Sequence, residues 1–350
     1  MKTHRIICPD DWHLHLRDGA VLRAVINASA SWCKRAIIMP NLVPPVTSAS
    51  DAKAYRQRIK AADASVTGFT PLMVLYLTEQ TDPQDVVTGF QAGIVSAVKL
   101  YPAGATTNSA SGVRDMRAVW PVLEAMQTHN IPLLIHGEVT DPEIDIFDRE
   151  AVFIDRVLIA LRAQFPELKI VLEHITTAQA ADYVLGAGEY QAATVTPHHL
   201  LINRNAYLAG GIRPHYYCLP VAKRETHRQA LVKAVMKDSG KLFLGTDSAP
   251  HIDSAKLQAC GCAGIFNAPN TMACLAQLFE NHHHLDRLEA FCSVYGPKFY
   301  GLEVNSETLV LRRHDTARPV PDAVMTEKGR ITAFDPQIDI YWSVAGIEKS

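Results

Sequence analysis

The sequence predicts an α/β fold in which eight parallel strands close into a (β/α)8 TIM barrel with a C-terminal extension. Short apolar or β-branched runs alternate with longer amphipathic stretches, as in repeated βαβ units. From His13 to Asp247 the chain completes seven strand-to-strand intervals of about 33 residues each, the size of such a unit. The strands are almost continuously apolar, as in Pro132-Leu-Leu-Ile135, which is typical of a sheet buried on both faces.

The individual elements follow from local patterns. Strands are expected over 5–15, 35–39, 70–77, 94–100, 131–136, 169–174, 191–196 and 242–247. Apolar residues at helical spacing predict helices over 51–62, 113–129, 148–164 and 223–237. Asp51 precedes a helical run, and Thr81-Asp82-Pro83 places proline in the first turn of another helix. Helices over 267–281 and 285–292 and an extended tail containing 309–311 complete the chain.

The chain of 350 residues is long enough for either one barrel or two domains. No segment is long or polar enough to be a linker between domains, and no internal repeat or low-complexity tract occurs. We therefore expect a single domain over 1–350. The barrel should occupy approximately 5–300, and the tail approximately 301–350.

Composition excludes several classes of protein. Hydrophobic residues make up 48% of the chain and charged residues 20%, so a large core can form and general disorder is excluded. The net charge of −2, without a basic block, argues against nucleic-acid or anionic-membrane binding. No apolar run approaches about 18 residues, the length that predicts a membrane span. Early charged residues argue against a signal peptide, and seven cysteines without C-x-x-C spacing indicate reduced thiols in a cytoplasmic protein.

Residues that can ligate a metal stand at the ends of five predicted strands. In chain order they are His13, His15, Lys99, His136, His174 and Asp247. In a barrel these strand ends converge on one mouth, where active sites of this fold lie. A lone strand-end histidine is more often a packing residue, Lys99 alone would form a salt bridge or bind phosphate, and Asp247 alone would cap a helix. Together, with two imidazoles on one face of the first strand, they predict a metal centre.

Neither the other histidines nor the motifs of other enzyme classes indicate a second chemistry. His282-His283-His284 is expected to be a solvated helix end, and His198-His199 to support the site from behind at most. The motifs G-x-S-x-G, G-x-x-x-x-G-K-[ST] and G-x-G-x-x-G do not occur. The sequence therefore lacks the patterns of serine hydrolases, P-loop proteins and dinucleotide-binding proteins.

Four segments resemble the amidohydrolase superfamily and, within it, dihydroorotases of the shorter bacterial type. They are DWHLHLRDG at 11–19, MPNL at 39–42, VKLYPAGATTN at 98–108 and GTDSAPH at 245–251. The resemblance covers essentially the whole chain, and every metal-ligand position of the family pattern is present.

The resemblance implies two zinc ions per subunit, which a hydroxide and Lys99 would bridge. The expected ligands are His13, His15 and Asp247 for one ion, and His136 and His174 for the other. A free lysine has a pKa of about 10.4 and is therefore a cation, which zinc would repel. The resemblance accordingly implies that Lys99 is present as its carbamate, N6-carboxylysine. The apolar strand around the amine would help to keep it neutral while it adds carbon dioxide.

The implied reaction is the reversible cyclisation of N-carbamoyl-L-aspartate to (S)-dihydroorotate in pyrimidine biosynthesis. The hydroxide attacks the ring amide, and Asp247 acts as the general acid and base. Arg17, on the same face as His15, offers a bidentate fork to the substrate carboxylate. By resemblance, Asn41 and His251 complete that pocket. Leu219 and Ala263 would contact the ring through backbone groups.

The segment 104–112 is bounded by glycines and rich in hydroxyl groups. It can be read as a plain flexible linker or as a lid in which Thr106 and Thr107 bind the substrate. Its position five residues after Lys99 favours the lid.

Two alternative functions stay open. Another cyclic-amide hydrolase, such as a dihydropyrimidinase or an allantoinase, would share the metal centre, but Arg17 with Asn41 favours a substrate that bears a carboxylate. A catalytically silent barrel that serves as an assembly partner should have lost ligands, and all six are present. The expected partner is a small-molecule substrate, and the resemblance implies a homodimer.

Overall fold

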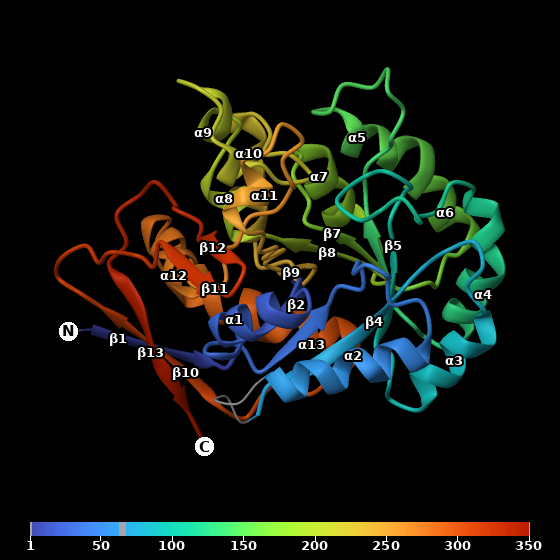
Figure 1. The fold of residues 1–350 in the computed structure, drawn as a ribbon, viewed down its shortest axis with the longest axis horizontal. Coiled ribbons are helices and arrows are strands. Elements are labelled where there is room, and N and C mark those ends of the chain that lie inside the picture. Colours follow the sequence, from blue (N-terminus) through green and yellow to red (C-terminus); the bar gives the residue numbers. More distant parts are fainter. Residues whose placement is uncertain (1, 63–67, 350) are drawn as a thin grey trace.

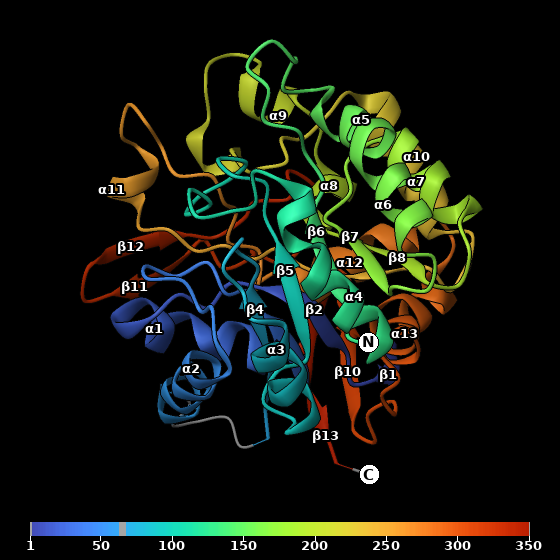
Figure 2. The same ribbon diagram turned by 90° about the vertical axis from the view of Figure 1, so that its right-hand side faces the viewer.

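The computed structural model describes residues 2–62 and 68–349 and confirms the TIM barrel (Figures 1 and 2). Eight parallel strands pair in chain order: β2 (Asp10–Leu14), β3 (Arg35–Ile38), β4 (Thr70–Tyr76), β5 (Ala97–Leu100), β6 (Leu133–His136), β7 (Ile170–Glu173), β8 (Gln191–Val195) and β9 (Leu242–Leu244). The first and last strands meet beyond β9, where the Asp247 N–H donates to the His13 carbonyl at 2.9 Å. The His15 N–H donates in turn to the Ser248 carbonyl at 3.1 Å.

An apolar layer fills the barrel interior below the mouth. Its members point inward from the strands: Trp12, Ile37, Met39, Val74, Ala97, Leu134, Val171, Ala192 and Phe243. Side chains alternate along a strand, so the next inward position lies two residues later. On β5, β6 and β7 that position is Lys99, His136 and Glu173 respectively. A layer of polar side chains therefore lies directly above the apolar one.

Helices surround the barrel, and they include those expected over 51–62, 113–129, 148–164, 223–237 and 267–281, whereas 285–292 contains a 3-10 turn (Leu285–Arg287) and the start of a π-helical turn (Ala290–Val294). They are α1 (Gly19–Ala30), α2 (Ala49–Ala62), α3 (Pro83–Gln91), α4 (Trp120–Thr128), α5 (Arg149–Phe153), α6 (Ile159–Gln164), α7 (Ala178–Gly186), α8 (Pro197–Leu201), α9 (Asn205–Leu208), α10 (Glu225–Val235), α11 (Asp253–Lys256), α12 (Thr271–Asn281) and α13 (Tyr295–Tyr300). A π-helical turn, Ile154–Leu158, joins α5 to α6, and a 3-10 turn, Met116–Val119, precedes α4. No helix in the described part of the chain is long and apolar enough to cross a membrane.

The two ends of the chain form a small sheet beside the barrel, which corrects one expectation. The strand expected over 5–15 is in fact two strands, β1 (Lys2–Ile7) and β2, separated at Pro9. β1 pairs antiparallel with β10 (Thr308–Arg313), which pairs with β13 (Trp342–Glu348) (Figure 1). β11 (Ala323–Thr326) and β12 (Gly329–Thr332) form a hairpin. The C-terminal tail therefore pairs with the N-terminal strand β1 and does not extend away from the barrel.

Candidate functional site

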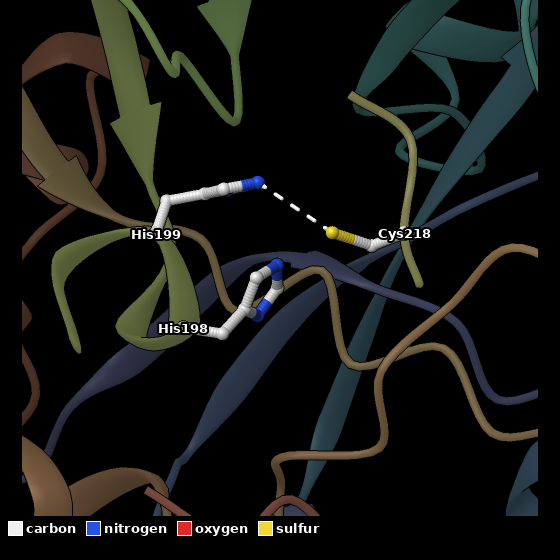
Figure 3. A group of neighbouring side chains, drawn as sticks. All are labelled: His198, His199 and Cys218. Atoms are coloured by element: carbon white, nitrogen blue, oxygen red, sulfur yellow. Dashed lines mark hydrogen bonds between the residues drawn. The ribbon is translucent and has the colours of Figure 1, made fainter. Parts of the chain in front are cut away.

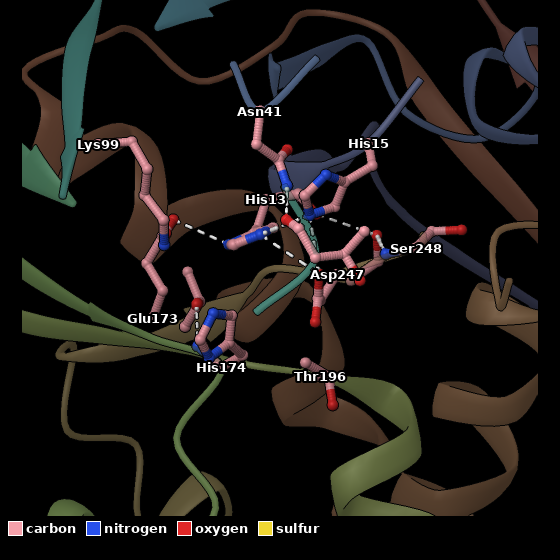
Figure 4. Close-up of polar contacts among 12 residues, drawn as sticks. His13, His15, Asn41, Lys99, Glu173, His174, Thr196, Asp247 and Ser248 are labelled. Carbon is pink, nitrogen blue, oxygen red and sulfur yellow. Dashed lines mark hydrogen bonds and ion pairs between the residues drawn. The ribbon is translucent and has the colours of Figure 1, made fainter. Parts of the chain in front are cut away.

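The structure brings all six predicted metal ligands to the mouth of the barrel. Three of them, His13, His15 and Asp247, form one compact group (Figure 4). His13 Nε2 and His15 Nε2 lie 3.2 Å apart. Asp247 Oδ1 lies 3.3 Å from the former atom and 3.1 Å from the latter. All three side chains are buried. Two imidazoles and a carboxylate that converge this closely form a set of donors that fits a divalent cation such as zinc.

The second predicted group lies next to the first. The His174 ring centroid is 5.0 Å from that of His13 and 4.8 Å from that of His136. Burial, followed by the charges of His136 and Lys99, holds the pKa of His174 well below its usual value, so the imidazole is neutral. Its Nδ1 is buried and has no hydrogen-bond partner among the described residues. An unpartnered buried nitrogen on a neutral imidazole is available as a metal ligand.

Lys99 is the third member of this group and is fully buried (Figure 4). Its Nζ contacts Glu173 Oε2 and lies 4.9 Å from the centroid of the Tyr101 ring. Burial lowers the pKa of Lys99, although Glu173 and Asp247 oppose that shift. The environment therefore favours the neutral amine, which is the form that reacts with carbon dioxide.

Irregular backbone aims several of these side chains into the mouth. One extra residue on β2 opposite β3, between Asp11 and Leu14, makes a bulge around His13. In a regular strand His174 would point away from the mouth, because Glu173 takes the inward position. His174 instead has φ of 42°, and Asp247 has φ of 45°, both in the left-handed region. A Cβ on Gly245 would lie 2.7 Å from the Thr194 side chain and 3.0 Å from His13 Cβ, so this position requires glycine.

Two buried carboxylates at the site were missed by the sequence reasoning. Asp11 Oδ1 accepts hydrogen bonds from the N–H groups of Thr246 (2.9 Å) and His13 (3.1 Å), and its Oδ2 accepts one from Thr246 Oγ1 (2.6 Å). Asp11 therefore ties the first strand end to the last. Glu173 Oε1 lies 3.0 Å from His13 Nδ1, while Oε2 contacts Lys99. The two-residue spacing from inward-facing Val171 could have identified Glu173 as part of the site.

The carboxylates around His13 favour positive charge at this one position. Burial alone would lower the pKa of His13, but Glu173 and Asp247 outweigh it and raise the pKa to about 9. The same contacts keep Asp247 ionised: burial raises its pKa, but His13 and His15 bring it well below its usual value. Two carboxylates that face a group of imidazoles stabilise a cation between them.

The residues assigned by resemblance to the substrate carboxylate also lie together. Arg17 Nε donates to the Pro250 carbonyl at 3.1 Å, and its Nη2 lies 2.9 Å from His251 Nε2. Burial and the nearby guanidinium lower the pKa of His251 to about 2, so this imidazole stays neutral. Arg17, Asn41 and Asn108 line part of a cavity of about 370 Å³.

The segment 104–112 lies over this pocket rather than away from the barrel. Asn41 Nδ2 donates to the Thr107 carbonyl at 3.1 Å, and Asn108 Nδ2 donates to the Asn41 carbonyl at 3.1 Å. Thr107 Oγ1 also donates to the Ala263 carbonyl at 3.3 Å. The Thr106 backbone is held by Ser109, whose Oγ accepts from the Thr106 N–H at 2.8 Å. These contacts place the segment beside the pocket, whereas its role as a lid and the hydrogen bonds from the two threonines to the substrate stay predictions.

Leu219 and Ala263, the predicted ring contacts, belong to neighbouring segments. The Gly264 N–H donates to the Tyr217 carbonyl at 3.0 Å, which places the two segments side by side. His251 Nε2 lies 3.0 Å from the Ala263 carbonyl. The backbone groups expected to face the pyrimidine ring are therefore close to the carboxylate pocket.

A second cluster of ligand-type side chains, His198, His199 and Cys218, lies behind the mouth (Figure 3). Both ring nitrogens of His199 are already engaged: Nδ1 lies 2.8 Å from Thr196 Oγ1, and Nε2 lies 3.0 Å from the Pro220 carbonyl. The Cys218 thiol contacts the same carbonyl at 3.3 Å. His199 and Cys218 are therefore held by hydrogen bonds within the protein, whereas His198 Nε2 is buried without a partner among the described residues. His282 and His283, in contrast, are exposed, as expected.

His198 is connected to the strand end that carries Asp247 through the side chain of Asn267. The Asn267 side-chain amide lies 2.9 Å from His198 Nδ1 and donates at 2.7 Å to the carbonyl of Thr246. Thr246 directly precedes Asp247, so the pair supports the last strand end from behind.

Comparisons with known proteins agree with the geometry. The amidohydrolase family matches this chain over residues 6–309. A dihydroorotase from Chelativorans sp. (strain BNC1) is 60% identical over 344 residues, which cover 98% of this chain and 99% of that protein. The crystal structure of dihydroorotase from Saccharomyces cerevisiae in complex with 5-fluoroorotic acid is similar over 100% of both chains, with a TM-score of 0.91 and 31% identity. Dihydroorotase from Campylobacter jejuni covers 98% of both chains, with a TM-score of 0.88 and 35% identity.

Proposed function

The chain belongs to the amidohydrolase family and has dihydroorotase activity, and we propose that this reaction takes place at the six buried ligands around Asp247. It interconverts N-carbamoyl-L-aspartate and (S)-dihydroorotate in pyrimidine synthesis. The main support for this location is that His13 Nε2, His15 Nε2 and Asp247 Oδ1 lie within 3.3 Å of one another. A catalytically silent barrel would have no reason to keep this set of donors together.

We propose that the enzyme, which is metal-dependent, uses two zinc ions. His13, His15 and Asp247 would hold one ion, His136 and His174 the other, and carboxylated Lys99 would bridge them with a hydroxide. When bound, the two ions would activate the attacking water and polarise the ring amide carbonyl. The Nδ1 atom of His174, which has no hydrogen-bond partner among the described residues, supports this arrangement. So does the buried amine of Lys99, whose pKa is lowered.

Asp247 is proposed to move the proton. Its low pKa makes it an anion at neutral pH, so it can accept a proton from the attacking water and deliver it to the departing ring nitrogen. Both histidines contact Oδ1, so Oδ2 is the oxygen expected to carry the proton. The Asp11 carboxylate holds Thr246 and thereby keeps this oxygen in position.

The substrate carboxylate is proposed to bind Arg17, Asn41 and His251. A neutral His251 can donate a hydrogen bond without adding a second charge beside the guanidinium. Backbone groups of Leu219 and Ala263 would orient the ring. The yeast relative was solved with 5-fluoroorotic acid, which is likewise a carboxylic acid, and this supports an anion-binding pocket. Dihydropyrimidinase and allantoinase substrates lack this group.

The cellular setting is also a proposal. We propose a cytoplasmic enzyme, since all seven cysteines are free and five of them are buried, as in proteins of a reducing compartment. The proposed homodimer rests on the family resemblance.

The activity assignment is tested by comparing substrates with metal content. Purified without chelators, the protein should contain about two zinc ions per subunit and turn over both dihydroorotate and N-carbamoyl-aspartate. Dihydrouracil and allantoin should react at least about 100-fold more slowly, because neither offers a carboxylate to Arg17. Faster turnover of dihydrouracil or allantoin would instead identify a different cyclic-amide hydrolase.

The lid is tested by the double variant Thr106→Ala/Thr107→Ala. Each lost hydrogen bond is worth about 0.5–1.5 kcal/mol and closure is weakened as well, so kcat should fall at least about tenfold. Metal content and melting temperature should stay at wild-type values, because the threonines are not ligands and lie outside the core. Unchanged kcat and KM would show that segment 104–112 is only a linker.

A further inference from the structure

Lys256, at the end of α11, is a buried lysine that the proposed reaction does not use. Only 4% of it is exposed. Its Nζ donates to the carbonyl of Tyr217 at 2.8 Å and to the carbonyl of Gly264 at 2.8 Å. The same ammonium lies 5.8 Å from the centroid of the Tyr217 ring. One side chain therefore joins two segments that are far apart in the sequence.

These two segments carry the backbone groups proposed to face the pyrimidine ring. Tyr217 is two residues before Leu219, and Gly264 directly follows Ala263. One direct hydrogen bond between the segments, from the Gly264 N–H to the Tyr217 carbonyl, reinforces the link through Lys256. Hydrogen bonds from a charged donor are about twice as strong as neutral ones, so the spacing between the segments depends on this ammonium.

The charge of Lys256 is not neutralised by an acid within the described residues. Asp253, on the same short helix, is engaged instead by the Thr332 hydroxyl and N–H at 2.9 Å each and lies 4.0 Å from Arg330. The other ionisable groups near Lys256 are the thiols of Cys218 and Cys262 and the guanidinium of Arg17. Burial and Arg17 lower the pKa of Lys256 to about 8. A buried ammonium without an acid partner favours an anionic ligand beside it.

We propose that Lys256 is a positioning residue for the substrate. Its ammonium holds the Leu219 and Ala263 segments at the spacing that the ring requires, and its positive charge favours carboxylate-bearing molecules in the pocket. This inference rests on the proposed function. N-carbamoyl-aspartate has two carboxylates and dihydroorotate has one, so the open-chain substrate depends more strongly on Lys256.

The test is Lys256→Met, which keeps the length of the side chain and removes its charge and donors. KM should rise about 10- to 100-fold for dihydroorotate and by a larger factor for N-carbamoyl-aspartate, while kcat stays within about threefold. Metal content should not change. Lys256→Arg, which keeps the charge and several donors, should recover part of the loss in KM. Should Lys256→Met fail to fold, Lys256→Gln, which keeps a donor without charge, allows the same comparison of the two substrates.

Lys241→Met is the matched control. Its Nζ also contacts two backbone carbonyls, those of Leu185 and Ala187, but it precedes β9 at the opposite end of the barrel. This control should keep wild-type kinetics. Unchanged KM values in Lys256→Met, a fall in kcat or melting temperature alone, or an equal effect in Lys241→Met would each overturn the positioning role. Wild-type protein that does not turn over dihydroorotate would refute the proposed function instead.

Discussion

Lys99→Ala is expected to abolish dihydroorotase activity and to lower the metal content. The substitution removes the amine that we propose to bridge the two ions as a carbamate, and it removes the side chain that Glu173 contacts in the buried site. Steady-state assays and metal analysis of the purified variant measure both effects. Short carboxylic acids such as acetate or propionate should restore part of the activity, because a carboxylate can take the place of the carbamate.

The rescue distinguishes a bridging role from a structural one. A variant that is merely misfolded would show a lower melting temperature and would not respond to carboxylic acids. Near-normal activity and metal content in Lys99→Ala would rule out the bridge. Lys241→Ala removes a lysine at the far end of the barrel and should behave as wild type in the same assays.

Arg17→Met should reduce kcat/KM for both substrates by roughly 30- to 1,000-fold while the zinc content stays at the wild-type level. A desolvated, charge-assisted bidentate contact is worth on the order of 2–4 kcal/mol, which corresponds to that range. Metal should be retained because the guanidinium contacts Pro250 and His251 and is not itself a ligand.

Arg58→Met is the control for Arg17. Arg58 lines the same cavity, but its guanidinium pairs with half-exposed Asp18 at 2.9 Å, an exposed ion pair that contributes little. It should change kcat/KM by less than about threefold. If Arg17→Met lost zinc, the guanidinium would have to support the metal centre rather than the substrate.

Much of the site can be predicted from the sequence. A strand of a parallel sheet is buried on both faces, and its side chains point alternately to the two faces. The apolar runs and their spacing of about 33 residues predict the barrel. The barrel in turn places Lys99 and His136 at inward positions above Ala97 and Leu134. The same alternation places Glu173 at the inward position above Val171.

Other features depend on contacts between residues far apart in the chain, and only the tertiary structure decided them. The run over 5–15 is apolar enough for one strand, but pairing of its first half with β10 divides it in two. His174 and Asp247 face the mouth because of left-handed backbone conformations that residue identity does not predict. Asp11 and Lys256 are ordinary charged residues in the sequence. Their roles arise only when folding brings Thr246 to the first strand end and Tyr217 beside Gly264, since a buried charge must find its hydrogen-bond partners wherever the fold places them.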